Sequence, residues 1–438
     1  MLASRRRPGR VSYRVPPLPA DVLAQPLPLM VAILFLLLGA RALGEVAERF
    51  GQPAMLGEIA AGILLGPSFL GWVPVSDELR TVAELGVFLL VVLAGMELNP
   101  LELRRSIEGR NAWIAVCSFF IPLAGGLLVG AVFRLDLMRT AFLGLCIAIT
   151  ALPVSVRTLI DLGILRTAVG QRIVSAAVFN DVLSLLILGV LLNMVGRESS
   201  LADLGLTLLG TTTKAAVFMA AVVLAYRALE WLVKRVPTVD LIVDRAIRGL
   251  RGRESLFAVT ILFVLVFASL SEAVGLHFVV GAFFGAMLLS HELLGGANFE
   301  QVQKTASGVT MGFLAPVFFG IIGLEFDVHT LSRFGLVAAV LVVAFGSKIA
   351  GGYVGGRLAG LGKSESLALG YGLNGRGIME LVIATIALEK GFIEPQLFSL
   401  VVLVGVVTTL ATPLLLQRAV PHVPELAAAR AAAAPPAG

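Results

Sequence analysis

Charged residues are scarce in this chain of 438 residues, since Asp, Glu, Lys and Arg together make up only 14% of it. Soluble domains carry about a quarter charged residues, so this composition excludes an ordinary water-soluble protein. Hydrophobic residues make up 58% of the chain and occur in long blocks. The formal net charge of +5 would suggest a nucleic-acid partner in a soluble protein, but here the basic residues lie between apolar blocks. We therefore expect a lipid bilayer as the partner and no nucleic acid.

Cysteine and histidine are also rare. Cys117 and Cys146 both fall inside apolar segments, so we expect buried free thiols and no disulfide. The histidines have no metal-ligand spacing, and the chain has neither an H-E-x-x-H motif nor the paired aspartates of an intramembrane protease. We predict a protein that is no enzyme and has no cofactor. The four histidines are His277, His291, His329 and His422.

What the chain does contain is apolar segments of membrane-spanning length. A bilayer core about 30 Å thick needs roughly 20 apolar residues per helix. That pattern fits about thirteen times and predicts an all-α polytopic membrane protein. The predicted helices are 26–47, 54–70, 81–98, 111–133, 140–161, 168–196, 205–235, 254–273, 275–293, 306–325, 334–360, 364–389 and 394–417.

The domain organisation predicted from this pattern is simple. Residues 1–25 form an N-terminal tail, residues 26–417 one transmembrane domain, and residues 418–438 a disordered low-complexity tail. Loops on one side of the membrane hold fifteen Lys and Arg residues, and those on the other side hold six. The positive-inside rule then places the C-terminus in the cytoplasm and the N-terminus outside, in a bacterial inner membrane. The arginines of "SRRRPGRVSYR" conflict with this orientation.

Two charges lie deep inside predicted helices. Asp181 is the one charged residue between Ile173 and Val195, and Lys348 lies fifteen residues into the helix that begins at Phe334. A charged group at mid-bilayer costs several kcal/mol, about 2.5–3.5 on insertion scales, and usually faces a partner or a water-filled cavity. Opposite charges in separate helices make each other cheaper to bury, which favours one shared site. The alternatives are a purely structural ion pair and, for the lysine, snorkelling to the interface.

Two predicted helices look interrupted at membrane depth. Pro153 in "CIAITALPVSVRTLIDLG" removes a backbone hydrogen bond, and Thr150 and Ser155 flank it. The segment "ALGYGLNGRGIMELVIATIAL" has Gly375 and Gly377 beside Asn374 and Arg376. It also matches the G-x-G-x-x-G pattern of dinucleotide-binding proteins, but it lacks the preceding strand that such a site needs. These are the fifth and twelfth predicted helices, an odd offset that an inverted repeat requires. Inverted repeats with two crossing discontinuous helices are typical of secondary transporters.

At this point the residues resemble a known family. The segments "PAMLGEIAAGILLGPSFLG", "ITALPVSVRTLIDLGILRTAVGQRIVSAAVFNDVLSLLIL", "APVFFGIIGLEFDV", "GSKIAGG" and "GYGLNGRGIMELV" are similar, in this order, to those of monovalent cation:proton antiporters. The similarity runs over residues 26–416 and is strongest to the second branch of that family. It implies a six-helix core that moves against a dimerising panel. We assign the core to residues 81–196 and 306–417, the panel to the remaining helices, and expect a homodimer.

The resemblance also implies roles for individual residues. Asp181 would carry either a cation or a proton, Asn180 would be its neighbour in a two-residue motif, and Thr150 would line the site. Lys348 would be the partner cation, and Arg376 with Glu380 would support the second broken helix. Electrogenic relatives carry two adjacent aspartates where this chain has Asn180-Asp181, and electroneutral ones often have Arg in place of Lys348. Potassium-efflux relatives carry a C-terminal nucleotide-binding domain, which we do not expect here.

The predicted function is exchange of Na⁺, or else K⁺, for H⁺ by alternating access. Asp181 would bind a proton or a dehydrated Na⁺ or K⁺ ion, while backbone carbonyls at the helix breaks and side chains nearby replace water around the ion. Asn180 supplies no second titrating group, so we expect electroneutral exchange of one cation for one proton. The alternatives are a pH-gated cation channel, an ion-coupled organic-anion symporter and a membrane sensor. The side chains that could line the ion are Asn180, Asn374, Ser155 and Ser184.

Overall fold

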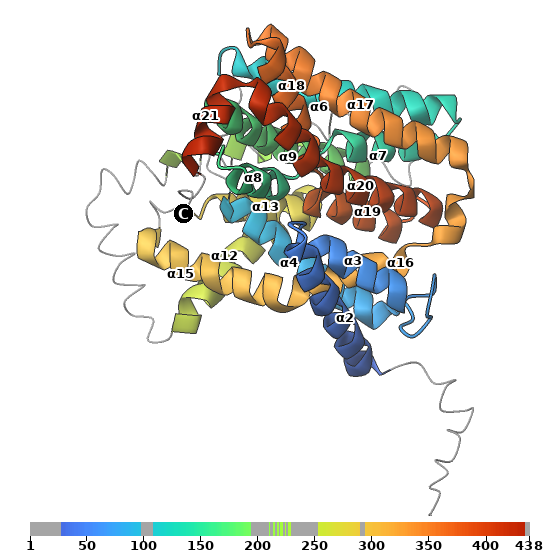
Figure 1. Cartoon of the computed structure of the whole chain (residues 1–438). Helices are drawn as coiled ribbons and strands as arrows, with labels where there is room; N and C mark the ends of the chain where they lie inside the picture. Colours follow the sequence, from blue (N-terminus) through green and yellow to red (C-terminus); the bar gives the residue numbers. More distant parts are fainter. Residues whose placement is uncertain are drawn as a thin grey trace, which may run out of the picture.

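The computed structural model describes residues 28–97, 108–193, 253–289 and 294–433, with isolated positions between 210 and 228. Figure 1 shows a bundle of helices, and the described residues contain no strand. The predicted all-α class is confirmed. The helices are α2 (Leu29–Arg49), α3 (Ala54–Leu65), α4 (Asp77–Glu97), α6 (Asn111–Val132), α7 (Leu137–Ala148), α8 (Leu152–Asp161), α9 (Ala168–Asn193), α12 (Arg253–Val274), α13 (Phe278–Met287), α15 (Gly296–Val309), α16 (Ala315–Glu325), α17 (Phe334–Leu358), α18 (Lys363–Gly372), α19 (Ile378–Glu389), α20 (Pro395–Ala419) and α21 (Pro424–Ala433).

The helix boundaries agree with the apolar pattern of the sequence. Within the described ranges, nine helical runs are long and apolar enough to cross a membrane, and α3 and α13 are shorter apolar helices. Every predicted membrane helix except 205–235 coincides with one helix or one pair of helices, and 205–235 lies mostly outside the described residues. The run that contains α15 and α16 begins about ten residues before its predicted start at 306. A π-helical turn, Thr310–Leu314, joins these two helices.

The described helices form two groups, which are visible as the upper and lower parts of Figure 1. We call α6 to α9 with α17 to α20 the core, and α2, α3, α4, α12, α13, α15 and α16 the panel, because each set packs mainly within itself. The core predicted at 81–196 and 306–417 therefore began one helix too early in each half. Both α4 and α16 pack on α3 or α13 of the panel.

Small residues permit the close helix packing of both groups. A Cβ atom on Gly352 of α17 would lie 2.5 Å from the Gly370 Cα atom of α18. Real Cβ atoms do not approach so closely, so any side chain here would push α17 and α18 apart. In a membrane, helices associate through such close contacts because lipid is as apolar as a leucine side chain. Glycine in these helices is therefore a packing residue.

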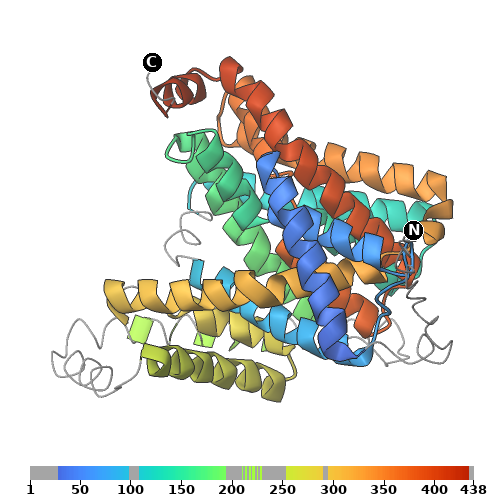
Figure 2. The same cartoon turned by 60° about the horizontal axis from the view of Figure 1, so that its bottom comes forward.

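The chain after α20 is ordered where disorder was predicted. The prediction that residues 418–438 are disordered is wrong for α21, which lies beside α8 and α9 in Figures 1 and 2. Its Leu426 side chain is fully buried, and Glu425 Oε1 accepts a hydrogen bond of 2.6 Å from the backbone amide of Ala168. The first amides of a helix have no partner within the helix, so a carboxylate there satisfies one donor and complements the helix dipole. The alanine-rich composition predicted disorder, but the buried Leu426 side chain and the Glu425 cap on α9 fix α21 against the bundle.

The contact between α21 and α9 makes a testable prediction. Glu425→Gln should lower the free energy of unfolding by about 1 kcal/mol, as loss of a helix cap does, and Leu426→Ala should cost about 2–5 kcal/mol because it leaves a cavity. Thermal unfolding of the purified protein in detergent measures both. The matched control is Glu300→Gln, on an exposed position of α15, which should leave the midpoint unchanged. Equal midpoints for Glu425→Gln and Glu300→Gln would contradict the capping role.

Candidate ion-binding site

Two interrupted helices cross at the centre of the core. The first break separates α7 from α8, and the second separates α18 from α19. They are hydrogen-bonded to each other, since the Ala151 amide donates to the Gly375 carbonyl at 2.9 Å. The Thr150 and Ser155 hydroxyls donate to the Leu373 and Gly372 carbonyls at 3.3 and 3.0 Å. The predicted crossing of the two broken helices is therefore confirmed.

Proline and glycine explain where the chain breaks. Pro153 lies in the first turn of α8, where a missing backbone N–H costs nothing, so it begins a helix and does not kink one. Gly375 and Gly377 lie in the other break. A Cβ atom on Gly377 would lie 3.1 Å from both Ala151 Cβ and Val154 Cγ2, so glycine lets the second break approach the start of α8. Each break thus needs the other to be close, because each supplies hydrogen-bond partners for the other.

Asp181 lies in the middle of α9, facing the start of α8. Its side chain is 3% exposed, and its Oδ1 atom has no hydrogen-bond partner. The Leu152 backbone, at the N-terminus of α8, interacts with the carboxylate. The partial positive charge of a helix N-terminus favours an anion at this position. Asp181 also lines a small cavity of about 20 Å³, together with Pro153, Ile378 and residues of α4 that include Glu97. A cavity of this size holds about one water molecule or one dehydrated ion.

Asn180 has a different position and a different set of contacts. Its amide nitrogen donates to Thr150 Oγ1 at 2.9 Å and to Ser118 Oγ at 3.3 Å. Because Thr150 in turn donates to Leu373, a chain of hydrogen bonds runs from α9 through the first break to the second. The Asn180 Oδ1 atom is buried without a partner, so it remains free to face a ligand. Asn180 therefore fixes the register of the two breaks relative to α9.

Lys348 lies in the same region but does not contact Asp181. Its ammonium group is fully buried and donates to the Ser118 carbonyl at 3.1 Å and to the Ala148 carbonyl at the end of α7. The C-terminus of a helix carries partial negative charge, so a cation there is stabilised without a carboxylate. The described residues include no ion pair of Lys348, although its charge acts on Asp181 at longer range. The sequence predicts a site shared by Asp181 and Lys348; in the structure the direct partners of the lysine are backbone carbonyls.

Arg376 and Glu380 form a second buried charge pair. Arg376 Nη1 lies 3.2 Å from Glu380 Oε1, and both side chains are fully buried. Arg376 also donates to the Ile147 carbonyl at 2.8 Å and, at the limit of hydrogen bonding, to Cys146 at 3.5 Å. The end of α7 is thus bound by two cations, one from α17 and one from the second break. This neutralises the carbonyls that the break leaves without helical partners.

The remaining predicted side chains divide into two kinds. Ser155 and Ser184 are bonded to backbone, Ser155 across the crossing and Ser184 to the Asp181 carbonyl of its own helix at 2.8 Å. Asn374, in the second break, is different because both polar atoms of its amide are buried without partners. A buried amide without partners is expensive, so it indicates a place where water or an ion can bind. Five of the predicted residues have a buried polar atom without a hydrogen-bond partner: Asp181, Asn374, Asn180, Arg376 and Glu380. Arg376 and Glu380 are paired with each other, so Asp181, Asn180 and Asn374 are the three that can face a ligand.

Sequence reasoning missed several polar residues of the site. Ser118 on α6 contacts both Asn180 and Lys348, and Thr409 on α20 donates to the Arg376 carbonyl at 2.5 Å. Ser118 is a single hydroxyl in an apolar helix, and nothing in its spacing distinguishes it. Thr409 did carry a signal, because "VVTTLAT" places three threonines on one helix that the repeat relates to α9. All three of these threonines, Thr408, Thr409 and Thr412, are buried.

The core therefore contributes fixed structural charges and one carboxylate without an ion pair, and Glu97 of the panel lines the same cavity. Two cations, Lys348 and Arg376, are bonded to the end of α7, and Glu380 is paired with Arg376. Asp181 is left facing a helix N-terminus and a cavity, with one oxygen unpartnered. A buried carboxylate beside crossed discontinuous helices in a membrane bundle is the construction of ion-coupled secondary transporters. That is the class of protein that this fold and this site define.

Comparison with known proteins gives the family. Residues 31–420 match the family model of the sodium/hydrogen exchanger, transmembrane, and the chain belongs to this family of transporters. The Na(+)/H(+)-K(+) antiporter GerN of Bacillus cereus is 30% identical over 389 residues, which is 88% of this chain and 94% of that protein. The Na(+)/H(+) antiporter NhaS4 of Synechocystis is 30% identical over 411 residues, 88% of this chain and 95% of that protein. The predicted resemblance to monovalent cation:proton antiporters is thus confirmed.

A solved structure supports the fold independently. The sodium proton antiporter MjNhaP1 from Methanocaldococcus jannaschii, solved at pH 8, superposes with a TM-score of 0.67 at 18% sequence identity. The match covers 88% of this chain and 96% of that chain. At this identity the likeness concerns the fold alone.

The buried pair of Arg376 and Glu380 makes a testable prediction. Arg376→Met should lower the free energy of unfolding by about 3–5 kcal/mol, because it leaves the Glu380 charge buried without its partner. Arg376→Met with Glu380→Leu should recover part of that loss, since the uncompensated charge is then absent. Thermal unfolding of the three proteins measures the effect, with Arg333→Met, at an exposed position, as the control. A double variant no more stable than Arg376→Met would contradict the pairing.

Proposed function

We propose that this chain exchanges one monovalent cation, Na⁺ or else K⁺, for one proton across a membrane by alternating access. Asp181 carries either the cation or the proton. The names of the relatives support this choice of ions, since GerN is a Na⁺/H⁺-K⁺ antiporter and NhaS4 a Na⁺/H⁺ antiporter. The single observation that carries the proposal for Asp181 is its unpartnered oxygen in a buried cavity at the start of α8.

Competition between the two ions follows from the chemistry of the carboxylate. Desolvation favours the proton-bound form of a carboxylate, and cations nearby favour the ionised form, so a buried aspartate near Lys348 meets both conditions. The cavity has room for about one dehydrated cation, and a proton on Asp181 removes the charge that would hold it. Asn180 Oδ1 and the Asn374 amide provide oxygen atoms without other partners, which can replace water around the ion.

The fixed charges of the site favour electroneutral exchange. Within the core, Lys348 and Arg376 are balanced by Glu380 and an ionised Asp181, so binding one proton or one monovalent cation at Asp181 changes the charge of the core by the same amount. Asn180 has no titrating group that would add a second proton. The two loaded forms therefore carry equal charge through the membrane. This argument holds as long as Lys348 remains charged during the cycle.

The position of the Asp181 cavity suggests how access alternates. Its walls come from both groups of helices, with Pro153 and Ile378 from the core and Leu90, Leu93 and Glu97 from α4 of the panel. A shift of the core relative to the panel would move Asp181 from one side of the barrier to the other. In this proposal the panel also forms a homodimer, the C-terminus lies in the cytoplasm, and the membrane is a bacterial inner membrane.

The first experiment tests exchange through Asp181. In acid-loaded proteoliposomes with the potential clamped, added Na⁺ or K⁺ should drive proton efflux, seen as dequenching of a pH dye, and choline should not. Asp181→Asn should abolish the response, because it removes the group that binds both ions. Asp77→Asn is the matched control, since the Asp77 side chain is 97% exposed at the start of α4. A folded wild-type protein without any response would favour an organic-anion symporter or a sensor, and a sustained cation current would favour a channel.

The second experiment tests the charge balance. The exchange rate of the wild-type protein should change by less than about twofold when the membrane potential is stepped by 100 mV. If one uncompensated charge crossed the membrane in each cycle, the same step would change the free energy of that crossing by about 2.3 kcal/mol. The measurement is dye dequenching at several potassium–valinomycin potentials with Na⁺ as the driving ion. A severalfold dependence on potential would contradict the one-for-one stoichiometry and leave the role of Asp181 intact.

A further inference from the structure

A second carboxylate is buried in the panel, on α3. The Glu58 side chain is only 4% exposed. In the described part of the chain it takes part in no hydrogen bond and no ion pair. Close packing of α2 on α3 holds it in place, since a Cβ atom on Gly57 would lie 2.1 Å from the Leu43 carbonyl oxygen. A buried charge without a partner costs free energy, so its presence needs a reason other than stability.

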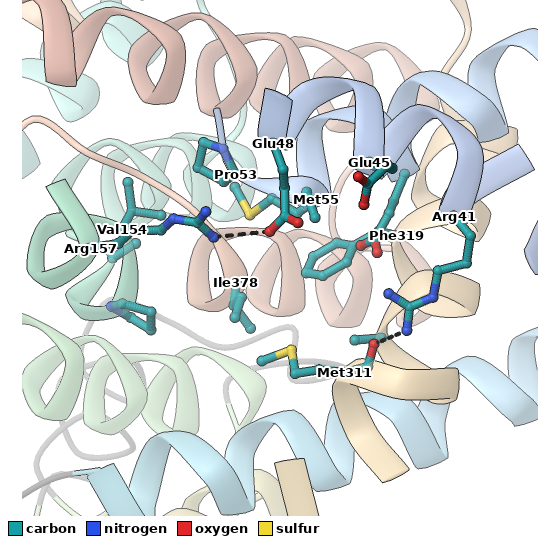
Figure 3. A pocket seen from close by; sticks show the side chains of 16 residues that line it. Arg41, Glu45, Glu48, Pro53, Met55, Val154, Arg157, Met311, Phe319 and Ile378 are labelled. Carbon is teal, nitrogen blue, oxygen red and sulfur yellow. Dashed lines mark hydrogen bonds and ion pairs between the residues drawn. The ribbon is translucent and has the colours of Figure 1, made fainter. Parts of the chain in front are cut away.

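Glu58 lines a cavity between the panel and the core. This cavity has a volume of about 390 Å³, with walls from α2, α3 and α16 of the panel and from α8 and α19 of the core. Figure 3 shows Glu45, Glu48, Arg41 and Arg157 around it. Its volume allows a cation to bind while it keeps several water molecules.

The other charges of this cavity are already engaged. Arg157 of α8 pairs with Glu48 of α2 at 3.2 Å, and Arg41 donates to the Met311 carbonyl (Figure 3). Glu45 pairs with Arg49 at the exposed rim. Arg41 and Glu48 are the charges that act most strongly on Glu58, yet neither forms an ion pair with it. Glu45 and Glu48 thus each have an arginine partner, and among the described carboxylates that line this cavity Glu58 is the one without an ion pair.

This cavity is adjacent to the one that contains Asp181. Both are lined by Ala151, Pro153, Met311 and Ile378, so these four residues form the wall between them. The wall is apolar, and the Asp181 cavity is about twenty times smaller. A hydrated ion that moves from the larger cavity to Asp181 must therefore lose water at this wall. A carboxylate on the wide side can hold the ion before that step.

We propose that Glu58 is a second cation-binding site, at which a partly hydrated monovalent cation waits before it reaches Asp181. The site lies on the panel, whereas Asp181 lies on the core. A single carboxylate with water suits a monovalent ion. The described residues contain no group of three His, Cys, Asp or Glu side chains that could hold a metal ion together, as a divalent cation would require. The inference rests on the proposed exchange of monovalent cations.

Binding is measured in protein that cannot use Asp181. In the Asp181→Asn background, NaCl should raise the thermal unfolding midpoint more than choline chloride at equal ionic strength, because a ligand that binds only the folded state stabilises it. Adding Glu58→Gln should remove this difference, and adding Glu45→Gln should keep it. No Na⁺-specific stabilisation in Asp181→Asn, or its persistence after Glu58→Gln, would overturn the proposal.

Transport kinetics and stability separate this role from a structural one. With Asp181 intact, Glu58→Gln should raise the KM for Na⁺ about fivefold, as expected for loss of one partly solvated charge interaction, with the maximal rate nearly unchanged. Glu45→Gln should leave KM within about twofold. In choline buffer Glu58→Gln should be as stable as the wild type or more so, because an uncompensated buried charge is removed. A lower midpoint in choline would instead identify Glu58 as a structural partner of Arg41.

The two proposals can fail separately. Exchange through Asp181 fails if Asp181→Asn still transports or if the wild type does not. The Glu58 site is judged from cation binding in a protein that does not transport, so its outcome does not depend on the exchange assay.

Discussion

The fold of this protein depends on the crossing of two broken helices inside the membrane. A break exposes carbonyl groups at the end of one half-helix and amide groups at the start of the next, and lipid offers no water to bind them. Here the two breaks bond to each other, as in the Ala151 to Gly375 hydrogen bond. Lys348 and Arg376 bind the carbonyls that remain at the end of α7. These side chains come from α17 and from the second break, so neither half of the core is satisfied without the other.

This requirement also shapes the proposed ion site. With the end of α7 neutralised by cations, the start of α8 presents its amides to Asp181, and the carboxylate keeps one oxygen free. Asn180, one residue earlier on α9, is bonded to Thr150 and so fixes where Asp181 lies relative to the break. Structural and functional groups are therefore neighbours in sequence but differ in their contacts. The Asn180 amide nitrogen donates to Thr150 and to Ser118, whereas the Asp181 Oδ1 atom has no partner.

The boundary between the core and the panel connects the two cavities. The wide cavity beside Glu58 and the narrow one beside Asp181 share a wall that includes Met311 of the panel and Ile378 of the core. The ion pair between Glu48 and Arg157 also joins the panel to the core. A movement of the core along the panel would have to break this exposed pair, whose contribution is small, about 0–1 kcal/mol. In the proposed mechanism the same surface provides the path of the ion and the contacts that break and re-form when access changes.

The sequence by itself determined the membrane-spanning class, most helix positions, the two breaks and the place of Asp181 and Lys348 inside membrane helices. These follow from local properties. A long apolar run spans the membrane, a proline or a glycine cluster interrupts a helix, and a charge inside an apolar run needs a partner or a function. Only the tertiary structure decided that Lys348 binds carbonyls and not Asp181, that Ser118 and Thr409 join the site, and that α4 and α16 belong to the panel. It also decided that α21 is ordered, through the bond from Ala168 to Glu425. That bond joins residues 257 positions apart, and no local pattern records which partner is near.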